Sequence, residues 1–486
     1  MRRFLGMVLM VLALPCIYLG GAGAVFYYQL HAVSGSVGLD RLPLVPAVDV
    51  HTRLLVVAPH CDDEMLGCGG LIQKTLHAGG QVRVAILTNG DGFRAATQRA
   101  LRDLRVEPQD YIRFARLRQE ESRRALAHLG VSPADVLFLG YPDRGLAALW
   151  HRHWTPDRPY TSPYTYRTCS PYPDTFHPKA RYCGQELLTD LIRVVRQFRP
   201  NRIVVTHPQD DHPDHSAAAA FVSLALQVLR HNPSDGVRVD RTLLEHYLVH
   251  RGDWPLPQGR HEGHPLCPPP AMAHLDTRWA KLPLTAAETD RKMQGILLYP
   301  SQTLVAGRFL ASFARQNELF GTLPSARVPL VSPRAIVVDG ATQDWQTVPP
   351  ALLHPVADNV MRDLDGGGDL RALYVCRDRY RLYLRCDMRQ TVAGHVRFTV
   401  HARTFSRDGR STPRGFTLLF SRADSLRSRA DGVRVAVHGR TVEVSVPRVY
   451  VDLPPREGPG AWLSLAVSTD VAGVTLDQSG IRLLEL

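Results

Sequence analysis

An apolar run and a polar turn adjoin in the stretch Leu54-Leu55-Val56-Val57-Ala58-Pro59-His60-Cys61-Asp62-Asp63-Glu64. The apolar half predicts a buried strand. The polar half places an imidazole and carboxylates where this strand ends and a helix over about Met65–His77 begins. Enzymes built on open α/β sheets bind their ligands at this position, outside the carboxyl ends of the strands. Such groups can hold a divalent cation, although Asp62 or Asp63 could also do no more than cap the helix.

Short apolar runs alternate with helix-period segments from Arg53 to about Gln209. We expect strands over Leu54–Ala58, Val82–Thr88, Val136–Leu139 and Ile203–Thr206. We expect helices over Met65–His77, Gln109–Leu129, Gln185–Phe198 and about Ser216–Arg230. This alternation is typical of parallel-strand units. The predicted fold class is α/β, with a Rossmann-like parallel sheet and helices on both faces, in a domain of residues 50–320. Two long irregular stretches, Gly140–Cys183 and Arg251–Asp276, are either walls of a substrate site or surface insertions.

The pattern changes after Gly321, where Pro324, Pro329 and Pro333 indicate a linker over residues 321–335. Short alternating runs then predict strands over Ala372–Cys376, Arg381–Cys386, His395–Val400, Phe416–Phe420, Val433–His438 and Val442–Val446. The sequence therefore predicts an antiparallel β-sandwich over residues 336–486. All proposed site residues precede the linker, so we expect a chain ended near Val331 to stay active if its core does not rely on the sandwich.

A second polar cluster follows the predicted strand Ile203–Thr206 and reads His207-Pro208-Gln209-Asp210-Asp211-His212-Pro213-Asp214-His215. Parallel strands end at the same edge of their sheet, so both clusters are expected to meet there. Together they can supply two histidines and one carboxylate to a divalent ion and leave a coordination position open.

These two clusters resemble motifs of the PIG-L (LmbE-like) de-N-acetylases. The His-Pro-Asp-Asp-Glu motif of that family appears as His60–Glu64, with Cys61 in place of proline, and its His-Pro-Asp-His motif appears as His212–His215. Supporting matches are Leu66–Gly70, Thr88–Gly90, Arg118–Glu121 leading to Leu129-Gly130, and Lys292 leading to Tyr299–Gln302. The resemblance covers about residues 53–320.

The resemblance implies that Zn²⁺ or another divalent metal ion is held by His60, Asp63 and His215. It implies that Asp62 is the general base, that His212 stabilises the oxyanion, and that Asp214 orients a histidine. Cys61 could alter the turn or expose a thiol near the metal. Glu64 and His207 are expected to support the site rather than react, and Tyr299, Ser301 and Gln302 either close a helix or contact the substrate.

The C-terminal part resembles family 9 carbohydrate-binding-like β-sandwiches, through motifs that are less specific than the two histidine motifs. These are Ile336–Gly340 with Asp344-Trp345, Asp369–Tyr374 and Arg381–Leu384. The resemblance implies glycan binding, but a sandwich that is purely structural fits the same residues. No binding residues can be placed.

The N-terminus indicates export. Arg2 and Arg3 precede an uncharged apolar stretch from Phe4 to about Leu30, which could span a bilayer. Residues 1–30 are thus expected to be a membrane anchor or a cleaved signal peptide, since Ala22-Gly23-Ala24 fits a processing site. If the segment is an anchor, we expect the catalytic domain to lie outside a bacterial inner membrane, in the periplasm or at the cell surface. If the segment is cleaved, we expect the protein to be secreted.

An exported chain can keep disulfides, so pairs Cys169–Cys183 and Cys376–Cys386 are plausible bridges. The net charge of +12 is spread along the chain without a basic motif, and no nucleic acid partner is expected.

The predicted function is therefore a metal-dependent hydrolase that removes N-acetyl groups from an amino sugar such as N-acetylglucosamine. Its expected partners are an acetylated glycan or glycolipid substrate and, through the N-terminal segment, the membrane. Two alternatives remain: the same amide chemistry on a non-carbohydrate acylated metabolite, and a non-catalytic glycan-binding protein on an enzyme scaffold.

Overall fold

The computed structural model describes residues 21, 23–24, 41–232, 238–252, 254–273, 275–358, 362, 365–409, 414–424, 432–453 and 461–486. Apart from positions 21, 23 and 24, the predicted N-terminal membrane segment lies outside these residues. Within the described ranges, none of the helices has the length and apolar character needed to cross a membrane.

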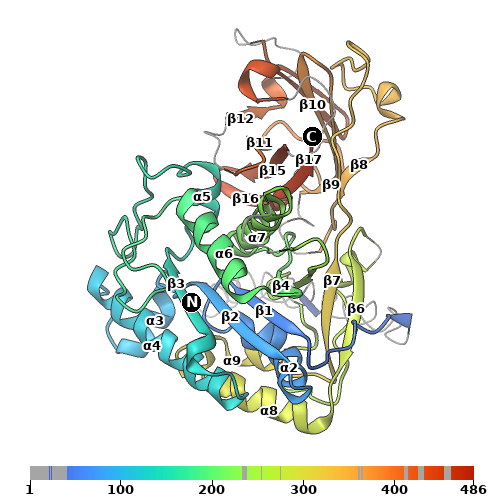
Figure 1. Ribbon diagram of the computed structural model, residues 1–486. Helices are drawn as coiled ribbons and strands as arrows, with labels where there is room; N and C mark the ends of the chain where they lie inside the picture. Colours follow the sequence, from blue (N-terminus) through green and yellow to red (C-terminus); the bar gives the residue numbers. More distant parts are fainter. Residues whose placement is uncertain are drawn as a thin grey trace, which may run out of the picture.

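A seven-stranded mixed sheet forms the first half of the molecule (Figure 1). Five parallel strands come first, in the order β3 (Val136–Tyr141), β2 (Gln81–Thr88), β1 (Arg53–Ala58), β4 (Arg202–Thr206) and β5 (Leu243–Tyr247). Two antiparallel strands follow, β7 (Asn317–Thr322) and β6 (Arg278–Pro283). The predicted parallel sheet is confirmed, but β5 and the antiparallel edge were not predicted.

Helices cover both faces of this sheet because alternate residues of its strands point in opposite directions. Leu54, Val56 and Ala58 of β1 pack on one face, and Leu55 and Val57 pack on the other. The first face is covered by α2 (Asp63–His77), α4 (Pro108–His128), α8 (Ala286–Leu297) and α9 (Pro300–Ala311). The second face is covered by α5 (Leu146–His151), α6 (Gly184–Phe198) and α7 (Pro213–His231). The short helix α3 (Arg94–Leu101) lies against α4 and α9.

Two antiparallel five-stranded sheets form the C-terminal part and enclose an apolar core. One sheet consists of β13 (Arg434–His438), β14 (Thr441–Pro447), β10 (Arg381–Met388), β9 (Leu370–Arg377) and β8 (Pro350–Leu353). The other consists of β12 (Gly415–Ser421), β11 (Arg397–Phe405), β15 (Trp462–Val471), β16 (Val474–Gln478) and β17 (Arg482–Glu485). The predicted antiparallel sheets are confirmed, and all six predicted strands are present.

The C-terminal sheets share a core with the first half of the molecule, on the side of α5, α6 and α7 (Figure 1). The ring of Trp150 in α5 lies 5.0 Å from that of Phe405 in β11, and its Nε1 donates to Ser464 Oγ at 2.7 Å. Trp462 and Ile481 are buried in the same cluster. A chain ended near Val331 would lose these partners, so the activity of that expected fragment stays a prediction that depends on how much its core needs them.

The cysteine pairs expected to form bridges are free thiols. Cys376 lies opposite Tyr383 in the β9–β10 ladder, whereas Cys386 lies opposite Leu373. This register directs the two thiols to opposite faces, Cys376 against Trp345 and Cys386 into the core between the sheets. The predicted Cys376–Cys386 bridge is therefore wrong, and Cys169 and Cys183 are also unpaired.

Candidate active site

The first part of the site is the tight connection between β1 and α2. Asp62 precedes the helix with a φ of 130°, an unusual value for a non-glycine residue. The helix packs close to the sheet because Gly67 lies against the ring of Tyr247, where a Cβ atom would come within 2.1 Å of a ring carbon. The glycine-containing motif after His60–Glu64 thus explains how α2 is held in place.

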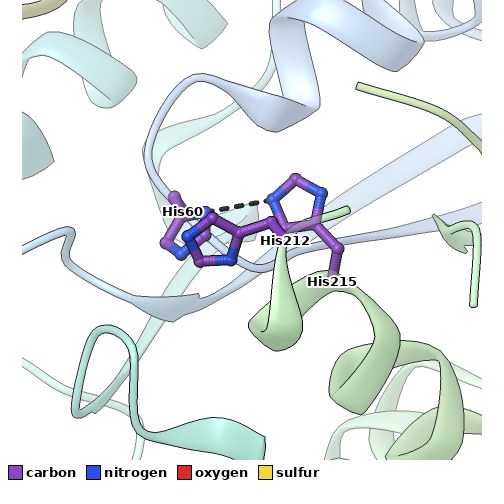
Figure 2. Close-up of side chains that lie close together, drawn as sticks. All are labelled: His60, His212 and His215. Carbon is purple, nitrogen blue, oxygen red and sulfur yellow. Dashed lines mark hydrogen bonds between the residues drawn. The ribbon is translucent and has the colours of Figure 1, made fainter. Parts of the chain in front are cut away.

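The second part of the site is the connection between β4 and α7. His212 is the N-cap of α7, and His215 lies in its first turn. Figure 2 shows both side chains directed from the start of α7 toward His60, which lies in the loop after β1. The imidazole centroids of His60 and His212 are 4.5 Å apart. The meeting of the two histidine motifs at one sheet edge is as expected.

The side chains of His60, Asp63 and His215 each present one donor atom to a common point. The distances are 3.2 Å between His60 Nδ1 and Asp63 Oδ2, 3.2 Å between Asp63 Oδ2 and His215 Nε2, and 3.2 Å between His215 Nε2 and His60 Nδ1. A tetrahedral ion with bonds of about 2.0–2.1 Å keeps its donor atoms roughly 3.3 Å apart. The triangle therefore fits a divalent metal ion.

Carboxylates face the outer nitrogens of both histidines. His215 Nδ1 lies 3.1 Å from Asp210 Oδ2, and His60 Nε2 lies 3.2 Å from Asp143 Oδ1 and 3.4 Å from Asp214 Oδ2. Such carboxylates orient histidine ligands and fix their tautomers. Asp214 is also bonded to the backbone N–H groups of Arg144 and Leu146, at the start of α5.

Asp143, Asp210 and His250 were not predicted as site residues. Asp210 lies inside the second histidine cluster, which was a usable signal, but Asp143 lies in an irregular loop without a motif. His250 follows β5 and groups with Asp63 and His215, their donor atoms lying within 4.8 Å of one another. His60, His212 and His215 form a second such group, so the ligand set His60, Asp63 and His215 stays a prediction.

The charges of this cluster are strongly coupled. Burial lowers the pKa of His215, but the carboxylates of Asp210 and Asp63 outweigh it and raise that pKa to about 9. Burial likewise opposes protonation of His60, yet contacts with Asp143, Asp214 and Asp63 raise its pKa well above the usual value. A cation that binds here must therefore displace protons from the imidazoles.

Asp62 lies beside the triangle with a carboxylate suited to proton transfer. Burial raises its pKa to about 7, Arg118 opposes this shift, and Asp63 and Glu64 add to it. Arg118 Nη2 lies 3.3 Å from Asp62 Oδ2. Gly90 makes room for this guanidinium, since a Cβ at position 90 would come within 1.6 Å of Arg118 Nη1. A general base with a pKa near the working pH is favourable for catalysis.

His212 is a neutral hydrogen-bond donor. Its Nδ1 accepts the backbone N–H of Asp214 at 3.2 Å, which leaves the ring proton on Nε2. Burial and the neighbouring His60, His215 and His250 lower its pKa well below the usual value. The Nε2–H can therefore donate to an oxygen atom without carrying a full charge.

A cavity of about 220 Å³ opens beside these groups, lined by His60, Asp62, Leu66, Phe93, Arg118, Asp143, Arg144, His212, His250, Gln302, Ala306, Phe309 and Leu310. Of the two long irregular stretches, Gly140–Cys183 contributes Asp143 and Arg144, while Arg251–Asp276 contributes nothing to this lining. Helix α9 supplies the opposite wall instead. A larger cavity of about 380 Å³, lined by residues of α7, β5 and β17 among others, contains none of the predicted site residues.

Several residues named from the sequence support the site from outside this cavity. Glu64 accepts hydrogen bonds from Tyr299 Oη at 2.7 Å and from Ser122 Oγ at 2.9 Å, and Ser301 is bonded to Glu121. His207 is buried against Trp279 and bonds Thr277 Oγ1 at 2.9 Å. Cys61 is fully buried, so the thiol is not exposed near the metal site. Of Tyr299, Ser301 and Gln302, which were expected either to close a helix or to contact the substrate, only Gln302 lines the cavity.

Part of the chain is similar to a known protein family and to named deacetylases. Residues 55–226 match the family model PIG-L, described as GlcNAc-PI de-N-acetylase. The chain is 35% identical over 201 residues to 1D-myo-inositol 2-acetamido-2-deoxy-alpha-D-glucopyranoside deacetylase 1 of Saccharopolyspora erythraea, covering 38% of this chain and 59% of the relative. It is 30% identical over 179 residues to the deacetylase of the same substrate name from Actinosynnema mirum, covering 36% and 54%. The chain thus spans little more than half the length of these relatives.

One solved structure shows a likeness to part of the chain. N,N'-diacetylchitobiose deacetylase from Pyrococcus horikoshii is 16% identical, with a TM-score of 0.34, and covers 61% of this chain and 91% of its own. The resemblance inferred from the two histidine motifs is confirmed by the family match, and the expected enzyme class agrees with the named activities of the relatives.

Proposed function

Because residues 55–226 contain a PIG-L domain, we propose that this protein is a metal-dependent hydrolase that removes N-acetyl groups from an amino sugar. The observation that carries the proposal is the triangle of donor atoms from His60, Asp63 and His215, with spacings of 3.2 Å. These residues would hold Zn²⁺ or another divalent ion. When bound, such an ion makes a water molecule acidic enough to attack an amide near neutral pH and polarises the amide carbonyl.

The protein's own groups account for the proton transfers. Asp62 would take a proton from the attacking water as the new bond to the carbonyl carbon forms. The same carboxyl group would return this proton to the departing nitrogen as the carbon–nitrogen bond breaks, giving acetate and a free amine. Arg118, 3.3 Å from Asp62, holds the carboxylate in position.

His212 would stabilise the negative charge that develops on the carbonyl oxygen. Its Nδ1 is occupied by the backbone N–H of Asp214, so only Nε2–H is available to donate toward the cavity. A donor held in place before the reaction costs no reorganisation at the transition state.

The named substrates of the relatives support an acetylated amino sugar as the substrate class. We further propose that the substrate is a polysaccharide or glycolipid outside the cytoplasm, supported by the apolar stretch after Arg2 and Arg3. This location involves the membrane as a partner through residues 1–30.

A second candidate is a non-carbohydrate acylated compound. It is favoured by the apolar side chains of Leu66, Phe93, Phe309 and Leu310, which line part of the cavity. Such side chains contact an apolar group better than a sugar hydroxyl.

The test incubates the full chain, loaded with Zn²⁺, with an acetylated oligosaccharide and with simple N-acyl amides of matched acyl group. Released acetate and new amines are measured separately. The proposal predicts equal amounts of both from the oligosaccharide and far slower release from the simple amides. Preference for the simple amides would favour the second candidate, and no release from any substrate would overturn the proposed hydrolase.

A further inference from the structure

A closed ring of charges joins the loop before His212 to the C-terminal part of the chain. Arg251 contacts Asp211 Oδ1 at 3.1 Å and Asp358 Oδ2 at 2.6 Å. Arg362 contacts Asp211 Oδ1 at 2.7 Å and Asp358 Oδ1 at 2.6 Å. Each arginine thus bridges the same two aspartates, one from each half of the molecule.

The two arginines of the ring are buried, and the ring is firmly anchored. Arg251 is 3% exposed and Arg362 is 2% exposed. Arg362 Nε also donates to Asp477 Oδ1 at 2.7 Å, and Asp477 accepts the backbone N–H of Leu370 at 2.8 Å. A buried guanidinium that loses its carboxylate partners is costly, so the ring resists opening.

Asp211 is held through its backbone as well as its side chain. Its N–H donates to His250 O at 2.7 Å, and its carbonyl accepts Gln478 Nε2 at 2.6 Å. Its Oδ2 accepts the N–H of Gly252 at 2.8 Å. Asp211 directly precedes His212, so these bonds fix the point at which the chain enters α7.

We propose that Arg362 is a positioning residue: through Asp211, the C-terminal part of the chain holds His212 where its Nε2–H can donate to the substrate. This rests on the proposed function, because it assigns a catalytic purpose to His212. The C-terminal sheets then contribute to turnover of every substrate, including short ones, whether or not they bind glycan. Displacement of a catalytic group by about 1 Å can lower a rate by a factor of about 100.

The experiment compares the full chain with Arg362→Ala, Arg362→Lys and Arg381→Ala. Arg381 is a matched control because it bonds Ser445 and Gly432 within the C-terminal sheets and lies outside the ring. On a short acetylated oligosaccharide, Arg362→Ala is expected to lower kcat by about tenfold to a hundredfold with little change in KM or metal content. Arg362→Lys should recover part of the loss, and Arg381→Ala should leave kcat unchanged.

Amide hydrogen exchange over residues 207–215 provides a readout that does not depend on activity. Exchange there should be faster in Arg362→Ala than in the full chain or in Arg381→Ala. If the protein does not hydrolyse acetylated sugars, the proposed function fails while this readout still tests the ring. If Arg362→Ala does not fold, Asp211→Asn takes its place, because it weakens the ring and leaves Arg362 paired with Asp358 and Asp477. Exchange and kcat both equal to those of Arg381→Ala would overturn the proposal.

Discussion

His215 Nε2 lies 3.2 Å from His60 Nδ1, although the two residues are 155 positions apart in the chain. His60 lies in the connection between β1 and α2, His215 lies in the first turn of α7, and Asp63 Oδ2 completes the triangle at 3.2 Å from both nitrogens. Two imidazoles and a carboxylate gathered at this spacing form a set of donors for a cation.

Substitution of the proposed base should separate chemistry from metal binding. Asp62→Asn is expected to retain the metal and to lose at least about a hundredfold in kcat, because the amide cannot accept a proton from water. Metal content by mass spectrometry and steady-state kinetics measure the two effects. Loss of the metal from this variant would move Asp62 into the ligand set.

Removal of the proposed oxyanion donor should also lower the rate without emptying the site. His212→Ala is expected to cost about 2–4 kcal/mol of transition-state stabilisation. The measurement is kcat in the metal-loaded variant. A variant that loses its metal instead would support the alternative donor group of His60, His212 and His215.

Arg118 should set the acidic limb of the pH profile. Its guanidinium opposes the effect of burial, which raises the pKa of Asp62 to about 7, so its removal raises that pKa further. The base acts when deprotonated, and Arg118→Gln should therefore shift the acidic limb of kcat/KM to higher pH. Arg118→Lys, which keeps the charge, should shift it less. Unchanged limbs in both variants would argue against Asp62 as the titrating base.

A chain ended at Val331 is expected to fold poorly. It would expose Trp150 and the α7 face that now pack against Phe405 and Trp462. Each large apolar side chain left exposed costs about 1.5–3 kcal/mol, and several are affected. Soluble yield and thermal unfolding of the fragment measure the loss. A stable fragment with unchanged kcat on a short substrate would contradict both this prediction and the role given to Arg362.

The parts of the structure that the sequence could predict are those with a local signal. The strand β1 and the turn after it are contiguous, and parallel strands must end at one edge, so the meeting of His60 with His212 and His215 could be expected. The antiparallel register of β9 and β10 could not be predicted, because it depends on the turn between the strands. A shift of the register by one residue would have placed Cys376 and Cys386 on the same face of the sheet.

Contacts between segments far apart in the sequence could not be predicted, because no local sequence pattern indicates them. The sequence around Trp150 and Phe405 would have the same apolar pattern whether the two residues packed in one core or in two, so the shared core was not predicted. Asp143 follows the end of β3 by two residues, but no motif in the sequence indicated that it would lie 3.2 Å from His60 Nε2. The bonds of Asp211 to Arg362 likewise depend on how the two halves pack.

The ligand set itself can be tested by substitution. Alanine at His60, Asp63 or His215 should lower both metal content and rate, because each removes one corner of the triangle. His250→Ala is the matched comparison, since His250 lies next to the triangle but outside the predicted set. Full occupancy in all three alanine variants would remove those residues from the set.

The most direct measurement is the rate of acetate release as a function of bound metal. The full chain is stripped with a chelator and then titrated with Zn²⁺ or Co²⁺, with metal content and rate determined on the same samples. We predict that the stripped protein is inactive and that the rate rises in proportion to bound metal, to a limit at one ion per chain. Undiminished turnover in the metal-free protein would contradict the account.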